Sequence, residues 1–325
     1  MKNKKPFVSV VLVTFNGLEV LKKCLPSFMK IEYPADRHEI ILVDNASSDD
    51  TVNYIKKHFP KIKLVRNTTN LGYVAINSAI PHCKGDFIYF TNNDVEINPG
   101  LVKNMVNVLL NDISVAMVTQ TTINYYNHRL VSGGTWVSRS MYCGHKRKTE
   151  NFDIIEAPYH GGGMIRKSII KKFGCIFDPD YFIYAEDLDL GMRIRLLGMK
   201  TVQISKAINY HMHSVTTMKY FTKYRNTFLL ERNLLMTFFK VFSVKTIAVL
   251  LPYVLLMRLL TILRDLITFR PKIAVARIMA VLWIVINLRK IAKKRRILQR
   301  LRVADDSYIL RIFSEKYLFK KPFLV

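Results

Sequence analysis

Short apolar runs alternate with segments of helical period in the first half of the chain, and this alternation constrains the fold most. Strands that alternate with helices of about ten residues predict a parallel sheet with helices on both faces. The expected strands are Val8–Val13, Glu39–Val43, Lys61–Val65, Phe87–Phe90 and Val115–Thr119. The expected helices are Gly17–Met29, Asp50–Phe59, Gly72–His82 and Pro99–Asn111. We therefore expect an α/β fold with a mainly parallel central sheet.

The alternation is lost over residues 120–160 and a helical pattern returns from Gly161. The middle segment is rich in Asn, Tyr, Gly and Ser, which predicts irregular strands and loops. Later helices are expected at Ser168–Phe173, Ala185–Leu197 and Tyr220–Phe239, the second of them ended by Gly198. Residues 1–240 are therefore expected to form the domain that carries the chemistry.

The last part of the chain, residues 241–325, is more apolar and then strongly basic. Ile247–Met257 has no charge, and Ile273–Leu288 is interrupted by Arg277, but both are shorter than the roughly 20 residues of a simple span. The basic run comprises Arg289, Lys290, Lys293, Lys294, Arg295, Arg296, Arg300 and Arg302. We expect amphipathic helices in a membrane interface, or a tight re-entrant pair, with the basic run on anionic lipid. The alternatives are a soluble helical subdomain and a true transmembrane pair.

The formal net charge of +26 indicates a polyanionic partner, either nucleic acid or an anionic membrane surface. The densest basic run follows the apolar segments and is not interleaved with aromatic residues, so a membrane partner is expected and nucleic acid is not. The four cysteines are scattered, as is typical of buried free thiols in a reducing compartment. The apolar run after the first lysines is short and lacks a cleavage site, which favours a first strand over a signal peptide. These features predict a peripheral or monotopic protein on the cytoplasmic face of the cell membrane.

Polar clusters follow the first four expected strands. They contain Thr14 and Asn16, then Asp44 and Asn45, then Arg66, Asn67, Asn70 and Gly72, and finally Asn92, Asn93 and Asp94. Each cluster alone is equally consistent with a capped turn. Together they predict a polar pocket, because ligands of such sheets bind beyond the carboxyl ends of the strands. Asp44 suits ribose hydroxyls or a base N–H, and Asp94 suits a divalent cation that also binds substrate phosphates.

Six segments match one enzyme family in order and spacing over roughly residues 6–235. They are Val8–Asn16, Val43–Thr51, Asn70–Gly72, Thr91–Val95, Gly161–Met164 and Ala185–Arg193. The chain resembles glycosyltransferase family 2, which has the GT-A fold, and especially its rhamnosyltransferase-like branch. The resemblance implies inverting transfer of a sugar from a UDP-, dTDP- or GDP-linked donor to a hydroxyl of a lipid-linked or cell-surface glycan. It also implies Mg²⁺ or Mn²⁺ as cofactor.

By the same resemblance, Asp44 binds the nucleoside, Asp94 is the surviving acid of the metal-binding DxD element, and Asp187 beside Glu186 is the general base. A carboxylate suits that last role, because it takes the proton of the attacking acceptor hydroxyl. The start of a helix favours the ionised form of Asp187. Asp189 is expected to cap the helix or to pair with Arg193.

The donor site implied by the resemblance comprises Thr14, Asn16, Asp44, Asn45, Asn70, Gly72, Asn93, Asp94 and Gly162. His211 is the expected additional metal ligand, with His213 as its rival and a structural or surface histidine as the alternative. Gly161–Gly163 either let the backbone approach a sugar or form a tight turn.

Two departures from the family pattern qualify these roles. Asn92 stands where a second acid is usual, so metal binding is expected to be weak before the donor arrives. The QxxRW motif of processive relatives is absent, which indicates transfer of single sugars. A sugar nucleotidyltransferase is the alternative enzyme, although the segment after the first strand, Thr14–Gly17, lacks the basic residue that a triphosphate needs. A basic nucleic-acid-binding protein is the second alternative.

Overall fold

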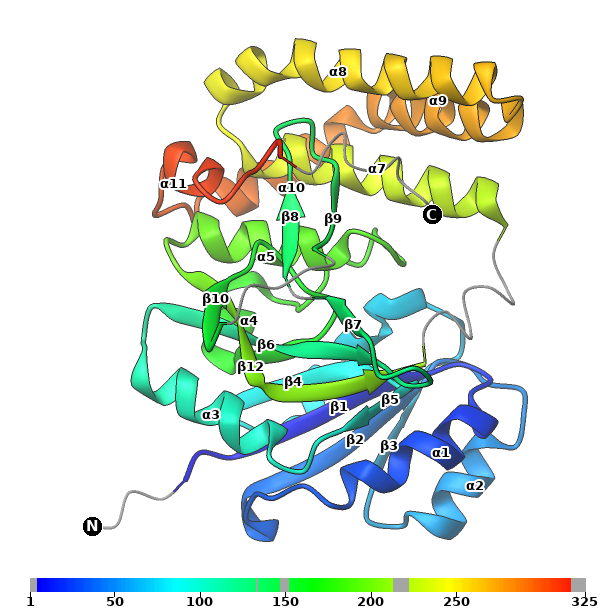
Figure 1. Ribbon diagram of the computed structural model, residues 1–325, viewed down its shortest axis with the longest axis vertical. Helices are drawn as coiled ribbons and strands as arrows, with labels where there is room; N and C mark the ends of the chain where they lie inside the picture. Colours follow the sequence, from blue (N-terminus) through cyan, green and yellow to red (C-terminus); the bar gives the residue numbers. More distant parts are fainter. Residues whose placement is uncertain (1–4, 133, 147–151, 213–221, 317–325) are drawn as a thin grey trace.

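A computed structural model describes residues 5–132, 134–146, 152–212 and 222–316. Its centre is a mainly parallel sheet in the order β10-β12-β6-β11-β4-β1-β2-β3, with β5 beside β12 and β7 beside β6 (Figure 1). The strands are β1 Val8–Thr14, β2 His38–Asp44, β3 Lys63–Arg66, β4 Phe87–Asn92, β5 Val95–Ile97, β6 Val115–Asn124, β7 Leu130–Ser132, β10 Ile154–Glu156, β11 Gly163–Arg166 and β12 Lys200–His211. A separate hairpin pairs β8 Thr135–Val137 with β9 Cys143–His145. The predicted α/β class is confirmed.

Strand β1 shows why this sequence forms a central strand. All seven of its residues are buried. Val10 and Leu12 face one hydrophobic core, and Val11 and Val13 face a second core on the other side of the sheet. A strand covered on both faces needs a continuous apolar run, and β1 has one. The sheet therefore separates two cores.

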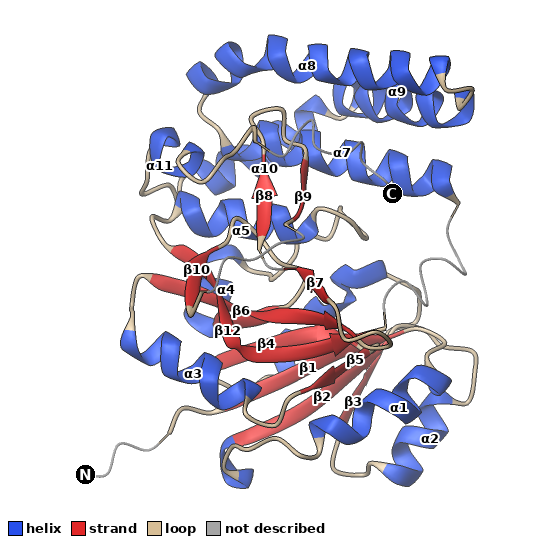
Figure 2. Cartoon of the chain, in the orientation of Figure 1, coloured by secondary structure: helices blue, strands red, loops and turns tan. Residues whose placement is uncertain are grey.

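Helices cover both faces of the sheet (Figure 2). We call residues 5–241 the catalytic half, after the chemistry predicted for it. Its helices are α1 Leu18–Phe28, η1 Ala35–Arg37, α2 Thr51–His58, η2 Gly72–His82, α3 Leu101–Asn111, α4 Lys167–Phe173, α5 Glu186–Leu196 and α7 Lys223–Val241. Helices α1 and α3 pack on one core, whereas η2, α4, α5 and α7 pack on the other. The prediction of a helix over Gly72–His82 holds, but η2 is a 3-10 helix. Pro81 cannot donate a backbone bond within it, and the N–H of Tyr73 donates to the carbonyl of Phe182 at 2.7 Å instead.

Four further helices follow: α8 Val244–Ile267, α9 Pro271–Ile286, α10 Leu288–Gln299 and α11 Asp306–Leu310. The α8–α9 hairpin lies on α7, at the end of the molecule away from α1 and α2 (Figure 1). Buried ion pairs join α7 to the hairpin. Glu231 on α7 pairs with Arg258, with Nε–Oε2 at 3.5 Å, and with Arg277, which also binds Asp265 at 2.7 Å. Buried ion pairs therefore link the two parts of the chain on either side of the domain boundary expected after residue 240.

The basic run differs in part from its predicted use as a lipid-binding segment. Lys290 and Lys294 form ion pairs with acids of the catalytic half, and Arg295 and Arg302 donate to carbonyls at the end of α7 and the residue after it. Four of the eight cations are thus used inside the protein. The exposed remainder are Arg289, Lys293, Arg296 and Arg300.

Within the described residues, α8 is long and apolar enough to cross a membrane, and α9 with α10, bent by 69°, forms a second candidate. Two charged residues of α8, Arg258 and Asp265, face the protein and are almost fully buried. The opposite face of the hairpin is apolar and exposed. Its members are Val249, Leu255, Leu256, Leu259, Leu260, Leu263, Leu266, Ile267, Val275, Ile278, Met279, Leu282, Val285 and Ile286.

Candidate active site

The carboxyl ends of three parallel strands place Thr14, Asp44 and Arg66 side by side in register. Asp44 is fully buried. It accepts hydrogen bonds from the N–H of Ser47 at 3.2 Å and from Nε of Arg66 at 3.4 Å. Arg66 is half-exposed, so its guanidinium connects this buried acid to the solvent edge of the sheet. This arrangement agrees with the predicted polar pocket.

Other residues of the predicted donor site hold the surrounding loops. The side chain of Asn45 donates to Asn70 at 2.9 Å and to the carbonyl of Gly72 at 3.0 Å. Asn16 has a left-handed backbone, with φ at 47°, and accepts from the N–H of Ser48 at 2.8 Å. These amides are therefore committed to loop geometry, and their direct contact with a donor stays a prediction.

Two of the predicted glycines are required by close backbone approach. Gly72 has φ at +72°, and a Cβ there would stand 2.2 Å from the carbonyl oxygen of Phe182. A Cβ on Gly162 would stand 3.0 Å from the carbonyl oxygen of Phe90, where β11 pairs with β4. Gly161 differs, because the atom that its Cβ would meet is Oδ2 of Asp187 at 3.8 Å. Gly161 thus leaves space directly beside the predicted base.

The end of β4 and the end of β12 bring the predicted metal ligands together. Nε2 of His211 lies 2.8 Å from Oδ1 of Asp94 and 3.2 Å from the amide nitrogen of Asn92. The amide of Asn93 turns the other way and donates to Thr14 at 2.9 Å. Both Asp94 and His211 are partly accessible to solvent. The rival ligand His213 lies outside the described residues.

A carboxylate and an imidazole at this separation fit one divalent cation, provided that other oxygens complete its coordination. In the part of the chain that the structure describes, no group of three or more His, Cys, Asp or Glu residues is placed to hold a metal. Asp94 and His211 alone would leave coordination positions of a cation open to other oxygens. The diphosphate of a nucleotide sugar has oxygens of the kind required.

Helix α5 begins with the two acids of the predicted catalytic pair. Ala185 precedes it in a left-handed conformation, with φ at 58°. Desolvation raises the pKa of Asp187 to about 6, although its Oδ1 accepts from the N–H of Leu188 at 2.8 Å. Burial and the neighbouring Asp187 raise the pKa of Glu186 well above its usual value. Because burial disfavours a second charge on the pair, we expect Asp187 to ionise before Glu186.

Tyr73 connects the metal ligands to the base and was missed by sequence reasoning. Its hydroxyl donates to the carbonyl of Gly161 at 2.7 Å. Burial raises the pKa of Tyr73, and the nearby Glu186, Asp187 and Asp94 raise it further. The three acids thus lie within electrostatic range of one phenol, which agrees with a single site for the predicted base and metal ligand. The Asn70–Gly72 motif that precedes Tyr73 was the available signal.

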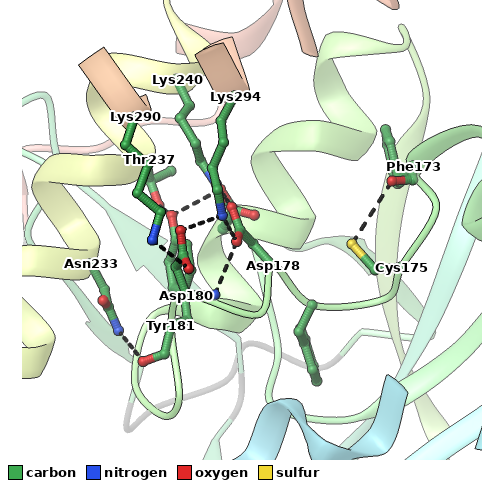
Figure 3. Close-up of polar contacts among 12 residues, drawn as sticks. Phe173, Cys175, Asp178, Asp180, Tyr181, Asn233, Thr237, Lys240, Lys290 and Lys294 are labelled. Carbon is green, nitrogen blue, oxygen red and sulfur yellow. Dashed lines mark hydrogen bonds and ion pairs between the residues drawn. The ribbon is translucent and has the colours of Figure 1, made fainter. Parts of the chain in front are cut away.

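A buried charge network joins α5 to α7 and α10, and Figure 3 shows its lysines around Asp178 and Asp180. Asp189 pairs with Arg193 at 2.7 Å, which was one of the two roles expected for it. It also pairs with Lys240 of α7 at 2.7 Å. Lys240 reaches Asp178 at 2.7 Å, and Lys294 of α10 pairs with the same acid. The two lysines hold the pKa of Asp178 well below its usual range, despite burial. The loop that leads into the catalytic pair is therefore fixed from two other helices.

Comparisons with known proteins agree with this geometry. Residues 9–174, about half of the chain, match the model of the family described as Glycosyl transferase family 2. A dolichyl N-acetyl-alpha-D-glucosaminyl phosphate 3-beta-D-2,3-diacetamido-2,3-dideoxy-beta-D-glucuronosyltransferase of Methanococcus voltae is 27% identical over 216 residues. A poly(ribitol-phosphate) beta-glucosyltransferase of Bacillus spizizenii is 25% identical over 212 residues. The matches cover 60% and 63% of this chain, but 63% and 32% of those relatives.

Solved structures share the fold at lower sequence identity. A mannosyltransferase from Pyrobaculum calidifontis, solved with GDP-Man and Mn²⁺, matches 98% of this chain and 89% of its own, with TM-score 0.53 and 17% identity. GalNAc-T7, solved with UDP, GalNAc and Mn²⁺, matches 73% of this chain and 48% of its own, with TM-score 0.59 and 18% identity. These likenesses show the GT-A fold. With six motifs, a shared fold and a matching family model, the chain belongs to glycosyltransferase family 2.

Proposed function

We propose that this protein is an inverting glycosyltransferase that moves a sugar from a nucleotide-diphospho-sugar to an acceptor hydroxyl. The observation that supports the proposal is that Asp94, which lies 2.8 Å from His211, and Asp187 are both near enough to Tyr73 to raise its pKa. In this proposal Asp187 is the base, and Asp94 and His211 have the chemistry to hold a cation. Both are required for a transfer in which a diphosphate leaves as a hydroxyl attacks.

In this proposal the donor lies along the carboxyl edge of the sheet. Asp44 accepts hydrogen bonds from the nucleoside, while Asp94 and His211 hold Mg²⁺ or Mn²⁺ with the donor diphosphate. When bound, the cation supplies positive charge for the departing nucleoside diphosphate. Asp187 removes the proton of the acceptor hydroxyl as the hydroxyl attacks the anomeric carbon from the opposite side. The protonated Glu186 beside it leaves a single negative charge on the pair.

The acceptor class is inferred from the printed names of relatives. One of them acts on a dolichyl-linked sugar phosphate and another on poly(ribitol-phosphate). We infer a lipid-linked or cell-surface glycan as acceptor here. Rhamnose or a hexose is the proposed sugar, on the strength of the resemblance described above. No feature of the structure favours the alternative nucleotidyltransferase.

We also propose that the α8–α9 hairpin lies in the cytoplasmic interface of a membrane. Its inner face buries Arg258, Asp265 and Arg277, and its outer face is apolar, so the pair is amphipathic. Exposed cations of α10 stand beside it and suit anionic lipid. A hairpin lying in the interface keeps its inner charges against α7, which supports this arrangement over a spanning one.

The donor proposal is tested with UDP-, dTDP- and GDP-sugars, each with Mn²⁺ or Mg²⁺, scored for binding and for nucleotide release on isolated membranes. We expect one nucleotide class to bind and turn over, and Asp44→Asn to weaken its binding. The matched control is Asp36→Asn, an acid on η1 in the loop before β2, which should leave binding unchanged. A chain that binds and turns over none of these donors would contradict the proposal.

The membrane proposal is tested by flotation with vesicles of phosphatidylcholine and phosphatidylglycerol. The double variant Leu260→Glu/Leu263→Glu changes two exposed residues of the outer face, and we expect it to stay in the unbound fraction. Leu110→Glu is the control, because Leu110 is 58% exposed but lies on α3. Equal flotation of all three proteins would exclude the hairpin as the contact.

A further inference from the structure

A cavity of about 490 Å³ lies between α7, the α8–α9 turn and the β8–β9 hairpin. Its walls are formed by α7 from Lys223 to Leu234, by residues 264–277 of the helical hairpin, and by Tyr142 and Cys143. The α8–α9 turn and the start of α7 lie on the same side of the molecule as the carboxyl ends of the central strands (Figure 1). The cavity therefore opens on the side where the candidate active site lies.

The lining of this cavity is strongly cationic. Lys223, Arg264, Arg270, Lys272 and Arg277 line it, against two acids, Glu231 and Asp265. Those two acids are already paired: Asp265 binds Arg264 at 2.9 Å and Arg277 at 2.7 Å, and Glu231 binds two arginines.

The cations at the mouth have no such partners. The side chains of Arg270 and Lys272 are exposed and make no polar contact with any residue that the structure describes. Helix α9 also starts here, at Pro271, so its positive end faces the same space. The mouth of the cavity is thus suited to an anion.

One residue of the cavity wall lies within electrostatic range of the predicted base. Cys143 lines the cavity, burial raises the pKa of its thiol to about 12, and Asp187 adds to that rise. Glu231, which also lines the cavity, acts on the same thiol. Cys143 is therefore the part of the lining that we use to orient a ligand toward Asp187.

The outer end of the cavity adjoins the apolar face of the hairpin. Phe269 lines the cavity, is 92% exposed and has a left-handed backbone, with φ at 54°. Leu266 and Ile267 precede it and are exposed as well. A ligand with an anionic head and a hydrocarbon tail could contact both the cations and the apolar surface. A soluble anion could contact the cations only, so the site favours the lipid.

We propose that this cavity holds the phosphate group of a lipid-linked acceptor, with its hydrocarbon chain along the α8–α9 face and its acceptor sugar directed past Cys143 toward Asp187. The inference rests on the proposed glycosyltransferase function and assigns the acceptor of that site. It also gives the hairpin a second role besides attachment, which is to present the lipid head to the base. Arg270 and Lys272 are the residues expected to recognise the phosphate.

The test compares Arg270→Glu/Lys272→Glu with a control, Lys56→Glu/Lys57→Glu, which makes the same change of net charge at exposed sites on α2, outside the cavity and away from the α8–α9 hairpin. Binding of the full-length proteins is measured to phosphatidylcholine vesicles that contain farnesyl phosphate, farnesol or phosphatidylglycerol. We expect wild type and control to prefer farnesyl phosphate over the other two. The cavity variant should lose about tenfold in affinity for farnesyl phosphate, as expected when cations near a lipid anion are reversed.

Three results would overturn the inference. The first is an equal loss of affinity for farnesyl phosphate in the cavity variant and the control. The second is wild-type binding that does not distinguish farnesyl phosphate from phosphatidylglycerol. The third is competition by inorganic phosphate that is as strong as competition by farnesyl phosphate. The last result would assign the cations to a soluble anion. Donor binding, measured separately by titration with nucleotide sugars, keeps the two proposals apart. If donors bind but the cavity variant keeps its preference, this inference alone fails; if no donor binds, the proposed function fails.

Discussion

The ionisation of the acidic pair at the start of α5 sets the pH dependence of any reaction at this site. The protein raises the pKa of Asp187 from 3.8 to about 6. This makes ionisation of the carboxyl group about 3 kcal/mol less favourable. Burial and the neighbouring Asp187 also raise the pKa of Glu186 well above its usual value. We therefore expect the pair to carry one charge at neutral pH. The substitution Glu186→Gln tests this, because Gln has nearly the shape of a protonated Glu and cannot ionise.

We expect kcat/KM for nucleotide release to be flat above a midpoint near pH 6 and to fall about tenfold per unit below it, since Asp187 must be ionised to accept a proton. Glu186→Gln should keep that midpoint within a few tenths of a unit, because it removes no charge. Asp187→Asn should lose roughly 10²- to 10⁴-fold in rate while donor binding persists. Glu19→Gln, at an exposed site on α1, is the control.

Two outcomes would refute this reasoning. A midpoint that falls by about one unit or more in Glu186→Gln would show that Glu186 is charged in the wild type and raises the pKa of its neighbour. An unchanged pH profile in Asp187→Asn would assign the base to another residue. Loss of donor binding in that variant would move Asp187 from proton transfer to donor recognition.

Further expectations follow from burial, backbone conformation and the composition of the metal site. Glu231→Gln removes the acid that pairs with the buried Arg258 and one of the two acids that pair with Arg277, and it should cost about 3–5 kcal/mol in urea unfolding. The exposed Glu19→Gln should cost less than about 1 kcal/mol, and equal costs would refute the buried network. Gly72→Ala should lower Tm more than Gly174→Ala, because both have φ above +70° but only the first Cβ would meet a carbonyl oxygen, at 2.2 Å. Asp94→Asn should weaken Mn²⁺ binding in calorimetry at least about tenfold when the donor is present, and a loss of the same size without donor would contradict a site completed by the diphosphate.

The sequence predicts the central sheet well because its signal is local. The apolar run of β1 requires burial on both faces, and the structure buries it so. The polar residues after the strands are therefore predicted to lie at one edge, and Thr14 and Asp44 lie in register there. The same holds for Asp187 in the first turn of α5.

Contacts between distant segments were not predictable in the same way. Tyr73 reaches Gly161 across 88 positions, and Lys294 reaches Asp178 across 116. Neither pair has a periodic pattern or a fixed spacing that marks it. The basic run shows the consequence, because composition assigned all of its cations to lipid, whereas packing neutralises part of them against acids of the catalytic half.

This use of the basic run changes how the last 85 residues should be tested. A chain cut after residue 240 would remove both arginines from the buried Glu231 and would leave Asp178 with Lys240 but without Lys294. Such a chain would lose the support of the loop before the catalytic pair as well as any membrane contact, so loss of activity and loss of attachment would coincide. Substitutions on the exposed apolar face separate the two. They leave every buried ion pair intact, and a variant that is active in detergent but does not float with vesicles would identify the hairpin as the membrane contact.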